Sequence, residues 1–321
     1  MSFRVIGTGS SLPKRVVTND DLSQFLDTSD EWIYSRTGIK QRHVCTTEGL
    51  DDLAIEASRK AVEAAGIDGS EIDLVVGSTT SPDHVVPAIA CVAADAIGAK
   101  HCAAFDLFIG CSGFVQGLDV VDGFFARGRA KKALVVAAEK VTSLVDWSDR
   151  ATCVLFGDGA GAVVLEATDE DPLPMHAWAT LDFALTLPGV RSTSPYDQRI
   201  GAYGKALTMN GREVFRFAVR AIIEEVNSLV AEAGIDVSDI DHFVFHQANE
   251  RILASAIKHL GLDDAKVVRR LEDTGNISSA CIPLALDTLN RNGGLKRGEL
   301  ICMIGFGAGL SVGSCLTRWE P

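Results

Sequence analysis

The sequence predicts an α/β protein made of two similar halves, and three observations support this prediction. An internal repeat relates residues 62–76 (VEAAGIDGSEIDLVV) to residues 230–244 (VAEAGIDVSDIDHFV) at an offset of 168. A second pair follows in the same order, residues 128–139 (GRAKKALVVAAE) and 294–305 (GLKRGELICMIG), at an offset of 166. Both pairs lead into continuous apolar runs, which are typical of strands buried on both faces. We therefore expect one architecture of helices and strands to occur twice.

Each copy of the first repeat predicts a helix, a turn and a buried strand. The amphipathic runs over residues 54–65 and 218–233 precede Gly66 and Gly234, and glycine commonly ends a helix. Both segments of the second repeat predict a basic turn that enters a buried strand.

The two halves are separated by residues 167–176 (ATDEDPLPMH), an acidic stretch with two prolines that suits a junction. We expect an N-terminal half over residues 1–170 and a C-terminal half over residues 175–321.

Composition limits the function classes. The 321 residues are 47% hydrophobic and 23% charged, an ordinary balance for a globular protein with a large core. The net charge of −13 argues against nucleic-acid binding. The sequence shows neither a signal peptide nor an apolar run of about 18 residues that could span a membrane. We expect a soluble cytoplasmic protein that binds neither nucleic acid nor membrane.

The eight cysteines form no Cys-x-x-Cys pair and lack the spacing of a zinc site. For seven we expect reduced, buried side chains that pack as small hydrophobes. These are Cys45, Cys91, Cys102, Cys153, Cys281, Cys302 and Cys315. His242 and His246 lie four residues apart, but in a predicted strand, where this spacing does not favour a metal pair. No metal site is expected.

The eighth cysteine, Cys111, lies in AFDLFIGCSGF (residues 104–114), where a buried strand should pass into a helix. Apolar residues then recur at helical spacing, namely Phe114, Leu118, Val121 and Phe125. At a helix N-terminus, free backbone N–H groups and the helix dipole stabilise a thiolate and lower the pKa of the thiol. By position alone, an inert structural thiol is the favoured interpretation, because buried inert thiols are common.

The second half places polar residues at equivalent positions. His246 directly follows an apolar strand in FVFHQANERI, and Asn276 lies in a glycine turn in DTGNISSACIP. By the repeat offsets, His246 corresponds to Ser78 and Asn276 to Gly110, the neighbour of Cys111. The three residues can therefore converge if the halves pack about a pseudo-two-fold axis. The glycine loop MIGFGAGLSVG (303–313) could add backbone donors, which completes a common set for acyl transfer.

Another glycine-rich stretch, FGDGAGAVVLE (156–166), follows the apolar run TCVLF (152–156). Because apolar strands are expected on both sides, we predict a hairpin or tight turn here. A dinucleotide-binding loop would need a helix after the glycines.

Seven segments identify the chain as similar to the β-ketoacyl-acyl carrier protein synthase III branch of the thiolase superfamily. They are DEWIYSRTGIKQRH, AFDLFIGCSGF, FGDGAGAVVLE, MNGREVFRFAV, FHQAN, GNISSACIP and GFGAGLSVG. They extend from end to end of the chain and are non-repetitive. The resemblance implies a thiolase-like five-layered αβαβα fold and a homodimeric acyltransferase of fatty-acid biosynthesis. Coenzyme A thioester is then a substrate, and no cofactor is implied.

The resemblance also implies roles for the residues singled out above. Cys111 would take the acyl group of an acyl-coenzyme A, and the backbone N–H groups of Cys111 and Ala308 would form an oxyanion site. His246 and Asn276 would bind the malonyl thioester of malonyl-acyl carrier protein and stabilise the enolate formed on loss of CO₂. Attack of this enolate gives 3-oxoacyl-acyl carrier protein, the step that initiates fatty-acid synthesis.

Binding positions follow from the same resemblance. Coenzyme A contacts are implied at Thr28, Trp32, Arg36, Arg150, Ala248 and Asn249. Docking of the acidic carrier protein is implied at Arg251 and Lys258, a local basic patch on an acidic chain. The acyl pocket is expected at Val86 and Phe108. The primer stays open, because a small Val86 would enlarge the pocket and Phe108 would fill it.

Related chemistries fit less well. Thiolases carry a second catalytic cysteine where this chain has Phe306, and elongating condensing enzymes carry a histidine where it has Asn276. Hydroxymethylglutaryl-coenzyme A synthases use a glutamate base upstream of the cysteine, and Glu71 is not a convincing match. Two alternatives stay open: a specialised-metabolism relative that acylates another acceptor, and a non-catalytic coenzyme A-binding subunit. The presence of Cys111, His246 and Asn276 together disfavours the second.

Overall fold

The computed structural model describes residues 2–189, 196 and 206–320 and contains two main β-sheets. The first sheet has the strand order β1-β7-β6-β4-β5 and the second the order β11-β12-β13-β8. The strand bounds are β1 (Ser2–Ser11), β4 (Leu74–Ser78), β5 (Ala103–Leu107), β6 (Lys132–Lys140), β7 (Asp158–Thr168), β8 (Met175–Asp182), β11 (His242–Phe245), β12 (Leu300–Gly307) and β13 (Gly309–Arg318). Two small pairs join β2 (Arg15–Thr18) to β3 (Gln41–Val44) and β9 (Leu185–Thr186) to β10 (Thr208–Met209).

Helices separate and cover the two sheets. The longer ones are α3 (Leu50–Ala65), α4 (Ile89–Ile97), α5 (Gly113–Ala126), α6 (Gly211–Ala233), α7 (Glu250–Leu260) and α9 (Cys281–Arg291). Shorter ones are α1 (Asn19–Ser23), α2 (Asp30–Thr37), α8 (Leu271–Thr274) and the single turns η2 (Val141–Ser143) and η5 (Ser278–Ala280).

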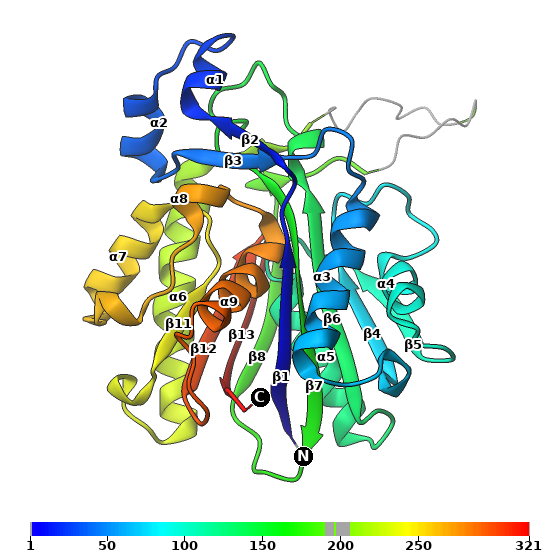
Figure 1. The fold of residues 1–321 in the computed structure, drawn as a ribbon. Helices are drawn as coiled ribbons and strands as arrows, with labels where there is room; N and C mark the ends of the chain where they lie inside the picture. The colour runs from blue at the N-terminus through cyan, green and yellow to red at the C-terminus, as the bar shows by residue number, and fades with distance from the viewer. Residues whose placement is uncertain (1, 190–195, 197–205, 321) are drawn as a thin grey trace.

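Three clusters of buried apolar side chains establish five layers. Residues of α3 and α4 pack on the outer face of the first sheet. Residues of α5 and α9 lie between the sheets, and those of α6 and α7 cover the outer face of the second. Figure 1 shows α6 and α7 on one side of the molecule and α3 and α4 on the other. The expected αβαβα order is confirmed.

The internal repeat corresponds to repeated structure. Helices α3 and α6 end at Gly66 and Gly234, whose φ angles of 65° and 66° lie in the left-handed region that favours glycine. Each helix is followed by a strand that pairs in parallel with the strand of the second repeat, β4 with β6 and β11 with β12. The strands of the first sheet end by residue 168 and those of the second begin at residue 175.

The prediction of a strand over residues 152–156 is wrong, and with it the prediction of a hairpin. Residues 151–155 form turns, and Gly159 and Gly161 lie inside β7. A Cβ on Gly161 would lie 2.7 Å from the backbone N of Leu284 in α9. The glycine therefore serves close packing of a helix on a strand rather than chain reversal.

The cysteine prediction holds only in part. Cys153, Cys281, Cys302 and Cys315 are buried, whereas Cys45 and Cys102 are partly exposed and Cys91 is exposed. Cys91 lies on α4, which turns its alanines toward the core and Cys91 toward solvent. All eight cysteines are free thiols.

Candidate active site

A cavity of about 340 Å³ is lined by residues from both halves. Cys111 comes from the first half, and His246, Asn276 and Ala308 come from the second. The structure thus brings the three predicted catalytic side chains to one cavity, although 135 and 165 residues of sequence separate Cys111 from the other two.

Cys111 lies in the connection between β5 and α5, two residues before the first helical residue. It is 8% exposed, and its Sγ donates to Ser278 Oγ at 3.4 Å. Burial raises the pKa of the Cys111 thiol to about 12, and the charge of Glu139 adds to this rise. The expected lowering of the thiol pKa is therefore wrong for the free protein, because desolvation of the thiolate outweighs the helix N-terminus.

Strand β12 packs directly against this turn. A Cβ on Gly307 would lie 2.8 Å from Cys111 Cβ, and one on Gly305 would lie 2.9 Å from Ser112 Cα. A Cβ on Gly110 would lie 3.7 Å from that of Ala308. The glycines of the 303–313 segment therefore allow the second half to reach the cysteine.

His246 follows β11 and is 1% exposed. Its backbone N–H donates to Ile304 O at 2.9 Å, and its ring meets that of Phe306 edge-on, with centroids 5.1 Å apart. Nδ1 has no hydrogen-bond partner in the part of the chain that the structure describes. Burial lowers the pKa of the imidazole to about 3, so the ring is neutral and one ring nitrogen carries a hydrogen to donate.

Asn276 follows Gly275, whose φ of 66° sets the turn. The carboxamide oxygen of Asn276 accepts from the backbone N–H of Ser278 at 2.8 Å. Because this bond occupies the oxygen, the NH₂ group is the donor left for a ligand in the cavity.

Two guanidinium groups lie close to the indole of Trp32, and all three residues line the cavity. The Cζ atoms of Arg36 and Arg150 lie 4.6 and 5.0 Å from the ring centroid of Trp32, distances typical of cation–π contacts. Arg150 also lies 3.2 Å from a carboxylate oxygen of Asp27. Thr28 does not line the cavity, and its buried Oγ1 has no partner among the described residues.

Asn249 links the rim to α7. Its oxygen accepts from Arg251 N at 2.9 Å and so caps the helix, while its Nδ2 donates to Arg36 O at 3.1 Å. Ala248 and Asn249 both line the cavity. Arg251 and Lys258 lie outside it, exposed and seven residues apart on α7, which places them on one face of the helix.

A second cavity of about 630 Å³ shares Gly110 and Ala308 with the first. Phe108 lines it, but Val86 does not; its neighbour Val85 does. Val86 is 79% exposed.

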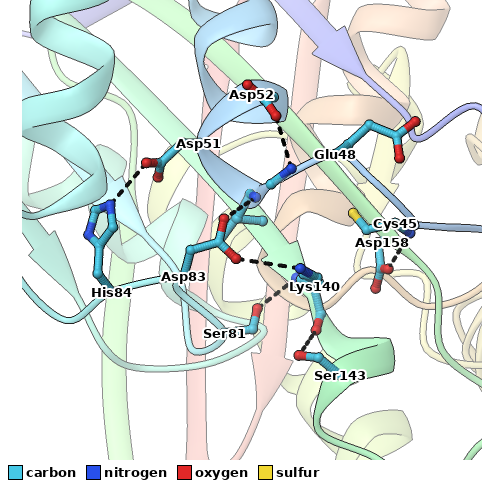
Figure 2. Close-up of polar contacts among 12 residues, drawn as sticks. Cys45, Glu48, Asp51, Asp52, Ser81, Asp83, His84, Lys140, Ser143 and Asp158 are labelled. Atoms are coloured by element: carbon cyan, nitrogen blue, oxygen red, sulfur yellow. Dashed lines mark hydrogen bonds and ion pairs between the residues drawn. The ribbon is translucent and has the colours of Figure 1, made fainter.

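Polar contacts fix Asp83 and His84 (Figure 2), which directly precede Val85 and Val86 in the chain. The Asp83 carboxylate accepts from the backbone N–H of Leu50 and lies 3.5 Å from Lys140 Nζ. His84 Nε2 lies 2.9 Å from the Asp51 carboxylate. The two valines therefore project from an anchored loop.

Sequence reasoning missed Glu139 and Ser278. Glu139 is a lone acid at the end of the apolar run ALVVAAE, which was a readable signal for a buried polar group, whereas nothing in the sequence distinguished Ser278 from its neighbours.

Among the described residues, no group of His, Cys, Asp or Glu side chains could hold a metal ion. His242 faces Glu299 at 3.0 Å rather than pairing with His246. In the same part of the chain, no helix combines the length and apolar character that crossing a membrane requires.

Comparison with known proteins assigns the chain to a family. The model described as 3-Oxoacyl-[acyl-carrier-protein (ACP)] synthase III matches residues 105–180, and the model of its C-terminal part matches residues 230–319. A beta-ketoacyl-[acyl-carrier-protein] synthase III of Clostridium acetobutylicum is 44% identical over 99% of both chains. One of Xanthomonas campestris is 47% identical over 98% of both.

Solved structures agree in fold. The 3-oxoacyl-[acyl-carrier-protein] synthase III of Aquifex aeolicus superposes with a TM-score of 0.91 at 38% identity, covering 99% of this chain and 100% of that one. The priming beta-ketosynthase of the R1128 polyketide biosynthetic pathway gives 0.90, also at 38% identity, with 99% and 96% covered.

Proposed function

The chain belongs to the 3-oxoacyl-[acyl-carrier-protein] synthase III family, and on this basis we propose that it condenses an acyl-coenzyme A with malonyl-acyl carrier protein. The products are 3-oxoacyl-acyl carrier protein, CO₂ and coenzyme A, and the reaction initiates fatty-acid synthesis. The supporting observation is the cavity in which a thiol, an imidazole and a carboxamide from two halves meet.

In the first half-reaction Cys111 is the nucleophile. Its sulfur bonds to the acyl carbon, the carbon–sulfur bond of the thioester breaks, and coenzyme A leaves with the thiol hydrogen. The backbone N–H groups of Cys111 and Ala308 stabilise the tetrahedral oxyanion; the close approach of Gly110 to Ala308 supports this pairing.

In the second half-reaction His246 and Asn276 donate to the malonyl thioester oxygen, on which charge develops as CO₂ leaves. The neutral imidazole and the free NH₂ of Asn276 are both donors, as this role requires. A donor aimed at such an oxygen typically contributes about 2.7–4 kcal/mol in the transition state. The enolate carbon then bonds to the acyl carbon held on Cys111, and the carbon–sulfur bond breaks. The released thiolate takes up one proton from solvent, which restores the thiol.

Coenzyme A binds at the rim, with the adenine against Trp32 and Arg150 and with Thr28 and Arg36 nearby. Ala248 and Asn249 line the passage for the pantetheine arm. The carrier protein docks on Arg251 and Lys258, exposed cations on α7, the helix that Asn249 caps.

We propose a homodimer, because β5 lies at the edge of the first sheet and, among the described strands, pairs only with β4, with exposed apolar residues nearby. Val85, Val86 and Phe108 are 54%, 79% and 56% exposed. In the dimer Val86 reaches the acyl pocket that Phe108 lines.

The enzyme acts in the cytoplasm, uses no cofactor or metal, and binds neither membrane nor nucleic acid. The halves are divided as 1–170 and 175–321, which the separation of the two sheets supports.

Intact-mass measurement with a panel of acyl-coenzyme A esters tests this function. We expect one acyl adduct, which is discharged with release of CO₂ when malonyl-acyl carrier protein is added. Cys111→Ala should abolish the adduct, whereas Cys91→Ala, which removes the exposed thiol, should not. His246→Ala should be acylated but release no product, with exposed His259→Ala as control. An adduct that persists in Cys111→Ala would refute the assignment.

The second candidate is a specialised-metabolism enzyme of the same family that uses another acceptor. It is favoured by the identity to the R1128 priming beta-ketosynthase, which equals that to the Aquifex enzyme. Discharge of the adduct without malonyl-dependent CO₂ release would select it.

A further inference from the structure

A buried carboxylate lies behind the nucleophile. Glu139, the last but one residue of β6, is 0% exposed. In the part of the chain that the structure describes, no Lys, Arg or His forms an ion pair with it. Its charge is held by hydrogen-bond donors alone, which is the condition for a stable buried carboxylate.

These donors come from both halves. Oε2 accepts from Thr80 N at 3.0 Å and from Ser81 Oγ at 2.6 Å. Oε1 accepts from Ser278 Oγ at 3.0 Å and Ser279 Oγ at 2.9 Å. Ser81 is itself held by the backbone N–H of Lys140 at 2.7 Å, a bond drawn in Figure 2. The carboxylate is therefore fixed in place.

Ser278 connects this carboxylate to the sulfur. Its φ of 48° lies in the left-handed region, and its N–H is fixed by Asn276 Oδ1, so the position of its hydroxyl is defined. That hydroxyl has one hydrogen and two neighbouring acceptors, Glu139 Oε1 at 3.0 Å and the sulfur of Cys111 at 3.4 Å. The hydrogen goes to the closer, charged oxygen. The serine oxygen then accepts the S–H hydrogen of Cys111.

We propose that Glu139, acting through the Ser278 hydroxyl, is a positioning residue that holds the resting Cys111 as a thiol. The negative charge of Glu139 disfavours a second negative charge on the Cys111 sulfur. Glu139 also accepts the Ser278 hydroxyl hydrogen, which is then not available to stabilise a thiolate. The S–H points toward Ser278, which leaves sulfur lone pairs toward the cavity. On acylation the thiol hydrogen ends on coenzyme A, so the charge of the buried site does not change.

Few other titratable groups face the sulfur. Within the described residues they are His246, which lines the same cavity as a neutral ring, and Cys281 of α9, whose thiol pKa burial raises. Strand β12 places Gly305 and Gly307, which have no titratable side chain, against Cys111. Neither His246 nor Cys281 supplies a charge that would counter Glu139 at neutral pH.

The proposal rests on the proposed role of Cys111, but its test needs no acyl substrate. Alkylation by iodoacetamide is followed between pH 6 and 10 by mass spectrometry of the Cys111 peptide. For the wild type we expect a rate that still rises at pH 10. Glu139→Gln should lower the midpoint pH, at which half of the Cys111 thiol is ionised and alkylation reaches half its maximal rate, by roughly one to two pH units. This is the effect of a unit charge about 6 Å away at an effective dielectric constant near 20. At neutral pH, alkylation then becomes about tenfold to hundredfold faster.

Variants of Ser278 distinguish the effect that Glu139 exerts through the serine hydroxyl, here called the relay, from the direct effect of its charge through space. Ser278→Ala removes a hydrogen already given to Glu139 and should shift the midpoint by less than about half a unit. In the double variant Glu139→Gln/Ser278→Ala, the fall should be smaller than in Glu139→Gln, because no hydroxyl is left to serve the thiolate. Equal shifts with and without Ser278 would overturn the relay.

A control is Glu225→Gln, which removes another buried carboxylate, on α6. Glu225 accepts hydrogen bonds from Ser314 of β13 and Trp178 of β8 and also lies 2.8 Å from His176. An unchanged midpoint in Glu139→Gln, or the same shift in Glu225→Gln, would overturn the proposal. If Glu139→Gln fails to fold, Glu139→Asp keeps the charge but withdraws it from Ser278 by one methylene. Its midpoint should fall by less than one unit, and no fall would count against the relay. Failure of acylation with the alkylation shift intact would instead refute the proposed function.

Discussion

Gly307→Ala is the substitution that most directly tests how the two halves meet at the sulfur. The added methyl would lie 2.8 Å from Cys111 Cβ, 3.0 Å from Cys111 N and 3.2 Å from Cys111 Sγ. Carbon atoms in contact prefer about 3.5–4.0 Å, so relief requires a displacement approaching 1 Å. The neighbouring atoms belong to backbone and to a short side chain, which cannot rotate away. The strain should therefore move the nucleophile itself.

Overpacking of this kind typically costs about 1–3 kcal/mol of stability, and a misplacement of about 1 Å can reduce a rate by about a hundredfold. We expect the rate of Cys111 acylation to fall by about that factor while the variant stays folded. The assay is rapid-quench intact mass with acyl-coenzyme A, combined with thermal unfolding.

The control is Gly123→Ala within α5, where an added Cβ meets nothing within 4 Å. In a helix interior this change should stabilise by about 0.5–1 kcal/mol and leave acylation unchanged. Wild-type acylation by Gly307→Ala would refute the inference that β12 fixes the sulfur.

Three further outcomes follow from the site. The pKa of His246 falls from an ordinary 6.5 to about 3 on folding, so as the pH falls below 6.5 the unfolded chain binds a proton that the folded chain does not, and the folded state loses stability. Between pH 7 and 5 the free energy of unfolding should decrease by about 2 kcal/mol from this cause. Urea unfolding of His246→Gln should lack this decrease. Trp32→Ala should raise the KM for acyl-coenzyme A by about tenfold with little change in kcat, whereas a similar loss of kcat at unchanged KM would exclude adenine binding there. Arg251→Glu/Lys258→Glu should raise the KM for malonyl-acyl carrier protein, less so at high salt, and an equal effect from the exposed Arg220→Glu would remove the docking assignment.

Much of the fold could be predicted because it is encoded locally and twice. The glycines that end α3 and α6 and the apolar runs of β4, β6, β11 and β12 are read from a few neighbouring residues each. The strand predicted over residues 152–156 failed because an apolar run does not distinguish a strand from a buried turn. Gly161 was misread for a related reason: its role depends on α9, more than a hundred residues away.

The residues of the site could be predicted from the sequence, but their burial, their pKa values and their hydrogen-bond partners could not. Cys111, His246 and Asn276 follow strand or turn patterns that can be seen in the sequence. The direction of the thiol pKa could not be read, since a helix start argues for lowering it and only burial reverses this. Glu139 was visible as an isolated acid, but its partner Ser278 lies 139 residues further along the chain.

The sequence by itself determined the two-fold repetition, the helix, turn and strand of each repeat and the residue types able to transfer an acyl group. Hydrophobic periodicity and the glycines that end helices act over a few neighbouring residues, so they can be recognised without the fold. Tertiary structure alone decided that the thiol is desolvated, that the imidazole is neutral and that a carboxylate reaches the sulfur through one hydroxyl. These properties depend on the dielectric surroundings and on contacts between β6, η5 and β12, and groups that distant in sequence acquire a common environment only when the halves pack.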